Sequence, residues 1–139
     1  MTAIEQQNVN NSLAIIEELE GVLNDAERSL KSARTWGFID TFGGGLVTDL
    51  IKHSKLNKAK SSMEYAQNLF ERLSSSLGAI PFPEDLRMQV GGFMTFADFL
   101  FDGTLVDVIM LSKIFSSIER VHEFQKKISQ LHTYLKKLS

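Results

Sequence analysis

The chain has 139 residues, of which 43% are hydrophobic and 23% charged, and its net charge at pH 7 is −2. This length fits one domain with a sizeable core, and the composition is that of a globular rather than a disordered protein. The small net charge does not favour nucleic acid as a partner. Because the chain has no cysteine, disulfides, thiolate zinc sites and a cysteine nucleophile are excluded.

Neither a leader nor a membrane span is expected from the sequence. The first twenty residues lack a basic segment followed by an apolar one, so we expect no signal peptide and a cytoplasmic protein. The most apolar window, Val90 to Leu111, contains Asp98, Asp102 and Asp107. Carboxylates at membrane depth are costly, so this window is not expected to cross a bilayer.

The first predicted helix runs from about Asn10 to Arg34. Apolar residues recur there at steps of three and four, which is the spacing of one helix face. They are Leu13, Ile16, Leu19, Leu23, Ala26, Leu30 and Ala33. Polar residues at 10–12 offer N-caps, so we expect residues 1–9 to be disordered.

The second predicted helix runs from about Leu46 to Leu77, and it has the most regular apolar pattern. Steps of three and four continue without a break through Leu56, Ala59, Met63, Ala66, Phe70, Leu73, Leu77 and Ile80. Pro81 and Pro83 then disfavour helix in the residues before them. We expect this helix to end near Gly78.

The third predicted region runs from Phe93 to Leu138. Gly91 and Gly92 open it, and its later apolar stripe extends from Leu111 to Leu138. Asp102-Gly103 predicts a kink or a break before the last long helix. The three regions together predict one all-α domain over residues 1–139. We expect an elongated antiparallel bundle or coiled-coil hairpin of three long helices.

A glycine-rich corner separates the first two predicted helices. We expect it to begin at Trp36 and to include Gly43, Gly44 and Gly45, which follow one another. Glycines before a helix can bind phosphate through backbone N–H groups, but neither common phosphate-loop spacing is present. We therefore favour a structural corner in which glycine lets two backbones approach closely.

Two i, i+4 pairs near the corners suggest a polar or metal site. Asp49 and His53 project from one face of the second helix, together with leucines, and Asp98 and Asp102 have the same spacing among phenylalanines. If the pairs meet, they form either a buried polar network or a nitrogen–oxygen site for a divalent metal such as zinc or manganese. A hydrogen-bonded network without metal is the favoured interpretation.

Two further groups of residues have a structural and a functional interpretation. The basic run from Lys52 to Lys60 spreads around its helix without interleaved aromatics, so we expect no nucleic-acid binding. Trp36, Phe38 and Phe42 at one corner, and the phenylalanines at 93–101 at the other, predict a hydrophobic plug where helices splay apart. The alternative is an exposed interaction surface.

The segments WGFIDTFGGG, followed by KHS, and GGFMTFADFLFDG resemble a family of small, uncharacterised helical proteins of low-GC Gram-positive bacteria. That family pairs a W-G-x-x-D-x-x-G-G-G segment and a K-H-S triplet with an F-x-D-x-F-F-D-like segment. The resemblance covers Trp36–Lys55 and Gly92–Asp107. It implies that Asp40, His53, Asp98 and Asp102 belong to one feature, and it implies no activity.

Two hypotheses for the function remain open. The first is a non-enzymatic protein–protein interaction or regulatory module without a cofactor, whose partners include a second copy of the chain in a homodimer. The second is a small-ligand- or metal-binding protein, or an enzyme, centred on Asp49, His53, Asp98 and Asp102.

Overall fold

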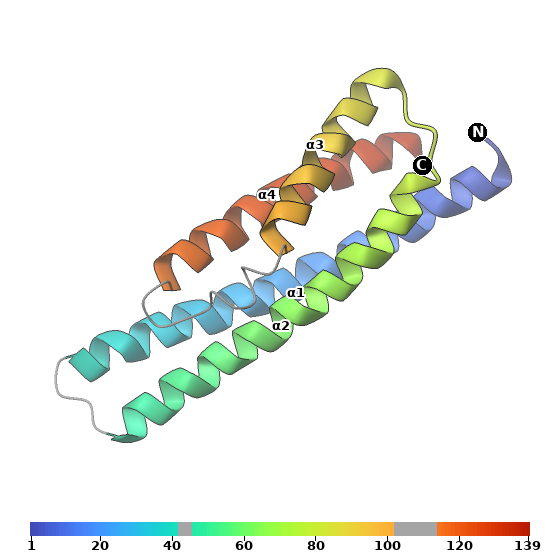
Figure 1. Cartoon of the computed structure of the whole chain (residues 1–139). Helices are drawn as coiled ribbons and strands as arrows, with labels where there is room; N and C mark the ends of the chain where they lie inside the picture. Colours follow the sequence, from blue (N-terminus) through green and yellow to red (C-terminus); the bar gives the residue numbers. More distant parts are fainter. Residues whose placement is uncertain (42–45, 102–113) are drawn as a thin grey trace.

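The computed structural model describes residues 1–41, 46–101 and 114–139, without the side chains of 36–41, 46–50, 52, 99 and 114–116. In these ranges the chain forms four helices (Figure 1): α1 (Ala3–Thr41), α2 (Leu46–Gly78), α3 (Glu84–Phe101) and α4 (Ile114–Leu138). The all-α prediction is confirmed. The prediction of three helices is wrong, because the third predicted region contains parts of two helices.

Helix α1 begins seven residues earlier than predicted, at Ala3 instead of Asn10. The Thr2 backbone N–H donates to the Glu5 carboxylate at 2.9 Å, and the Glu5 N–H donates to the Thr2 hydroxyl at 3.1 Å. This reciprocal capping box satisfies backbone donors that a helix start leaves unpaired. The expectation that residues 1–9 are disordered is therefore not met, since residues 3–9 are helical.

The far end of α1 also differs from the prediction. The helix continues past Arg34 to Thr41, so the backbone at Trp36 is helical and does not begin the corner. Gly43, Gly44 and Gly45, together with the side chains of Trp36 and Asp40, lie outside the described residues and side chains. Helix α2 then covers Leu46–Gly78, as predicted.

Helix α3 begins at Glu84 instead of Phe93 because the segment after Pro83 is a good helix start. The Pro83 carbonyl accepts a hydrogen bond from the Arg87 N–H at 2.8 Å. Glu84 and Asp85 stand in the first turn, where carboxylates interact favourably with the helix dipole. Gly91 and Gly92 consequently lie inside α3 and do not open it. The predicted kink at Asp102-Gly103 lies outside the described residues.

Helices α1 and α2 form a long antiparallel hairpin, and α4 lies along α1 while α3 packs over α4 and α2 (Figure 1). A buried polar contact fixes the hairpin at its terminal end. The Ser12 hydroxyl donates to the Ser76 hydroxyl at 2.7 Å, and the Ser76 hydroxyl donates to the Asn8 carbonyl at 3.0 Å.

All four helices contribute to one hydrophobic core. Its residues follow the predicted stripes. The fully buried ones include Leu19, Leu23, Ala26, Leu30 and Ala33 of α1, Ala59, Met63, Ala66 and Leu73 of α2, and Val121, Phe124, Ile128 and Leu135 of α4. The apolar stripes predicted from periodicity are therefore confirmed as buried where side chains are described.

Five phenylalanines from three helices meet where α3 covers the hairpin, and we refer to them as the phenylalanine cluster. They are Phe70, Phe93, Phe96, Phe101 and Phe124. The Phe124 ring centroid lies 5.8 Å from that of Phe93 and 5.5 Å from that of Phe101, and Phe70 lies 6.1 Å from Phe93. Phe93 and Phe101 are buried. The described phenylalanines at 93–101 thus pack in the core, as expected of a hydrophobic plug. The side chains of Trp36 and Phe38, and the whole of Phe42, lie outside the described part of the chain.

The length and polarity of the described helices also bear on membrane insertion. None of the described helices is both long and apolar enough to span a bilayer.

Candidate functional site

The predicted polar site is only partly visible, and its two described members do not lie in apolar surroundings. His53 of α2 and Asp98 of α3 are both exposed. The side chains of Asp40 and Asp49, and the whole of Asp102, lie outside the described part of the chain. The expectation that His53 and Asp98 face the core is therefore wrong.

The face of α2 on which His53 lies explains its exposure. His53 shares that face with Asn57 and Lys60, at i+4 and i+7, and both of these residues are exposed. The buried stripe, which begins at Leu56 and Ala59, points about 100° away around the helix. Within the described ranges no three histidine or carboxylate side chains come close enough to hold a metal ion. Since Asp49 and Asp102 are outside those ranges, the divalent-metal site stays a prediction.

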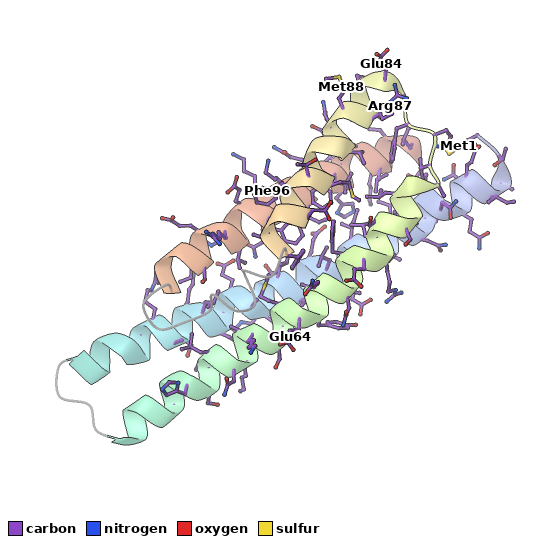
Figure 2. The ribbon with its side chains drawn as sticks, in the orientation of Figure 1. Met1, Glu64, Glu84, Arg87, Met88 and Phe96 are labelled. Atoms are coloured by element: carbon purple, nitrogen blue, oxygen red, sulfur yellow. The ribbon has the colours of Figure 1, made fainter. Side chains whose placement is uncertain are left out.

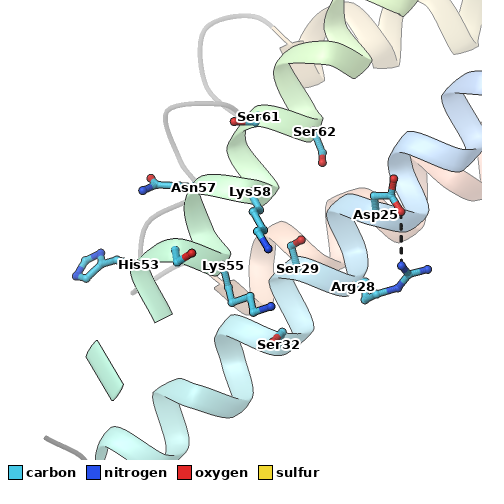
Figure 3. A pocket seen from close by; sticks show the side chains of 11 residues that line it. Asp25, Arg28, Ser29, Ser32, His53, Lys55, Asn57, Lys58, Ser61 and Ser62 are labelled. Carbon is cyan, nitrogen blue, oxygen red and sulfur yellow. Dashed lines mark ion pairs between the residues drawn. The ribbon is translucent and has the colours of Figure 1, made fainter. Parts of the chain in front are cut away.

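A groove between α1 and α2 is hollowed into the described surface, and we call it the hairpin groove (Figure 3). Its volume is about 1000 Å³. Four residues of α1 and seven of α2 line it. They are Asp25, Arg28, Ser29, Ser32, His53, Ser54, Lys55, Asn57, Lys58, Ser61 and Ser62.

The hairpin groove results from residue size on either side of the α1–α2 seam. Ala26 and Ala33 of α1 and Ala59 of α2 are fully buried in this seam. Alanines let two helices pack closely. Ser29 and Ser32 flank the seam on α1, and their short side chains leave the space above it open. Longer side chains at these positions would cover the seam.

The hairpin groove is positively charged. Lys55 and Lys58 are three residues apart, and their side chains extend from α2 toward α1 (Figure 3). Among the described lining residues, Asp25 is the only acidic one. Its carboxylate lies 3.7 Å from the Arg28 guanidinium, with both side chains largely exposed. Among the described residues, neither lysine forms an ion pair with another side chain. The lining therefore offers ammonium and hydroxyl donors to an anion.

Helix α4 contacts α1 on the side opposite the hairpin groove, through a row of polar contacts. The Glu20 carboxylate lies 2.8 Å from His132 Nδ1, and the Gln125 amide donates to the Asn24 side chain at 3.0 Å. The Glu27 carboxylate lies 2.9 Å from His122 Nε2. Because α4 occupies this flank of α1, it leaves the flank with Ser29 and Ser32 open.

Within this row, the carboxyl group of Glu27 has a strongly lowered pKa. The Lys31 ammonium lies 2.6 Å from the Glu27 carboxylate. Hydrogen bonds from Lys31, and then from His122, lower the pKa of Glu27 from 4.5 to about 2. Glu27 is therefore ionised at neutral pH and holds α1 to α4 from within the interface.

Sequence reasoning missed the hairpin groove, although its signal is present. The basic run was considered as one helix face for nucleic acid, and its spread around α2 argued against that. The relevant pattern is divided between two helices. On α2 it consists of Lys55, Lys58 and Ser62, at i, i+3 and i+7, and on α1 it consists of Ser29 and Ser32.

Comparisons of the chain with protein-family models, curated proteins and solved structures give no match. The resemblance to the low-GC Gram-positive family thus stays a prediction. The case for a function rests on the geometry of this molecule.

Proposed function

We propose that this protein is a non-enzymatic helical interaction module that binds an acidic segment of a partner protein in the hairpin groove. The observation that carries the proposal is the charge of the lining. Its described residues combine the positive side chains of Arg28, Lys55 and Lys58 with one negative side chain, Asp25. Charge complementarity of this kind steers association and selects acidic partners.

The dimensions of the hairpin groove fit a short peptide segment. The lining covers Asp25 to Ser32 on α1 and His53 to Ser62 on α2. At 1.5 Å of rise per residue, these stretches are about 10 and 14 Å long. An extended segment of about four residues spans that length, so two or three carboxylates of one segment can reach the lysines and the serine hydroxyls together.

The chemistry of the lining supports binding rather than catalysis. A serine nucleophile needs a base within hydrogen-bond reach. In the described part of the chain, no hydrogen bond joins a groove serine to Lys55, Lys58 or His53. These hydroxyl and ammonium groups stand on regular helix faces, where they suit the recognition of carboxylates or phosphates.

The test uses a fluorescein-labelled peptide of eight glutamates and the purified full-length protein, with binding followed by fluorescence anisotropy at low salt. We expect saturable binding that weakens as salt is added. The variant Lys55→Glu/Lys58→Glu should lose at least about tenfold in affinity, because it inverts the charge of the groove. A peptide of eight glutamines should not bind.

The matched control is Lys60→Glu/Lys126→Glu, which makes the same charge change at two exposed residues outside the groove. It should bind the peptide nearly as the wild type does. Equal losses in both variants, or no binding of the glutamate peptide, would overturn the proposal. Binding of inorganic phosphate without binding of the peptide would instead favour a small-anion protein.

A further inference from the structure

Helix α3 has a second face that no other described element covers. Its inner face is buried through Val90, Phe93 and Ala97. Its outer face presents Arg87, Met88, Gly91, Thr95 and Asp98, all of them exposed. Met88 is 75% exposed, the highest value among the described large hydrophobic residues. The start of α3, with Arg87 and Met88, projects from the body of the molecule (Figure 2).

The two glycines of α3 have no role in the packing of the single chain. Glycine is among the poorest helix formers, yet Gly91 and Gly92 stand in the interior of this helix. A Cβ atom added at either position would meet nothing within 4 Å. The Thr95 hydroxyl donates to the Gly91 carbonyl at 3.0 Å. The residues at the centre of the outer face are therefore small, and the Thr95 hydroxyl already donates a hydrogen bond within α3. Another helix can approach this face closely.

The charges at the two ends of this face complement each other under a twofold axis. Arg87 and Asp98 are eleven residues apart, close to three full turns, so they share one side of the helix. Among the described residues neither forms an ion pair. If a second α3 lies antiparallel, with the axis between Gly92 and Phe93, each Arg87 stands opposite the partner's Asp98. Isologous interfaces require such self-complementarity.

We propose that the outer face of α3 binds the same face of a second copy of this chain, giving an antiparallel, twofold symmetric homodimer. Arg87 pairs with the partner's Asp98 at both ends, Gly91 lies at the close approach, and Met88 packs against the partner's helix. The surface is separate from the hairpin groove, so the proposal goes beyond the proposed function. Because one pair of 18-residue helices makes a small interface, dissociation in the micromolar range is expected.

Charge exchange tests this pairing. Sedimentation velocity of the wild type from about 1 to 300 µM, a range that brackets a micromolar interface, should show a reversible monomer–dimer equilibrium. Arg87→Asp and Asp98→Arg should each weaken dimerisation at least about tenfold, because each places like charges opposite each other. The double variant Arg87→Asp/Asp98→Arg restores opposite charges and should dimerise nearly as the wild type does.

Two more variants separate this surface from others. Gly91→Leu has open space in the single chain, so it should keep its helical circular dichroism and lose the dimer. Glu119→Arg, at an exposed residue of α4, should leave the dimer unchanged. A wild type that is monomeric throughout, a double variant that fails to recover, or a Gly91→Leu protein that dimerises normally would each overturn the proposal. Peptide binding by the hairpin groove should not differ between Gly91→Leu and the wild type, so the two proposals can fail separately.

Discussion

Two parts of the core follow the same helical repeat but fill space differently. In the phenylalanine cluster, rings from α2, α3 and α4 pack within about 6 Å of one another. Along the α1–α2 seam, buried alanines such as Ala26, Ala33 and Ala59 take the same repeat positions. We call this second part the alanine seam. Large rings need several helices around them, whereas alanines let two helices close on each other.

This difference in side-chain size has a functional consequence. Where rings fill the core, α3 and α4 cover the hairpin. Where alanines form the seam and serines flank it, the outer surface of the hairpin stays open as the hairpin groove. The size of the residues at the buried positions therefore distinguishes two parts of the hairpin. The part with large rings is covered by α3 and α4, and the part with alanines carries the hairpin groove.

The largest expected effect concerns the closed part. Phe124 is fully buried and its ring lies next to three other phenylalanine rings. Phe124→Ala should lower the free energy of unfolding by about 3–5 kcal/mol, because it removes buried area and leaves a cavity between helices. Urea denaturation followed by circular dichroism measures this loss. Lys126→Ala, at an exposed residue of α4, should cost less than about 0.5 kcal/mol. Similar losses in the two variants would contradict the cluster as the main packing centre.

A smaller effect is expected from enlarging a residue in the alanine seam. Ala59 is fully buried where the helices are close, so Ala59→Leu should lower the free energy of unfolding by about 1–3 kcal/mol through overpacking. Urea denaturation again gives the value. Its neighbour Lys60 is exposed, and Lys60→Leu should change stability by less than about 0.5 kcal/mol. If Ala59→Leu were neutral, the seam would contain spare room and the explanation of the groove would fail.

The smallest effect is pH-dependent and concerns the tie between α1 and α4. The folded pKa of Glu27 is lowered to about 2, mainly by its hydrogen bond with Lys31. A lowered folded pKa means that the stabilisation is present above pH 4.5 and is lost as the pH falls from about 4.5 to about 2. Glu27→Gln should therefore cost about 1 kcal/mol at pH 7, an amount fit for a partly exposed pair.

The measurement compares wild type and Glu27→Gln by urea denaturation at pH 7, 4 and 2.5. The difference between the two free energies of unfolding should shrink toward zero at the lowest pH. Glu123→Gln, which removes the same charge at an exposed residue of α4, is the matched control. A difference that is constant over this range would show that Glu27 does not stabilise the fold through its charge.

Several helix boundaries were readable from local residues, and others were misread. The end of α2 followed from Gly78 and the two prolines after it. The start of α1 is also encoded in the sequence, because Thr2 and Glu5 form a capping box. The prediction of an N-cap at residues 10–12 is wrong. The start of α3 after Pro83 was missed because Gly91 and Gly92 were interpreted as a helix start. The hydrogen bond from the Arg87 N–H to the Pro83 carbonyl, and the first-turn carboxylates of Glu84 and Asp85, outweigh the low helix propensity of those glycines.

The sequence by itself determined the helical class and the buried stripes of α1, α2 and α4, because the spacing of apolar residues depends only on the geometry of a single helix. Only the tertiary structure decided which flank of α1 receives α4 and which stays open. A stripe specifies a face to be buried and does not specify the element that buries it. For this reason the pairing of Glu27 with His122, the exposure of His53 and Asp98, and the meeting of α1 serines with α2 lysines in one groove could not be predicted from either segment alone.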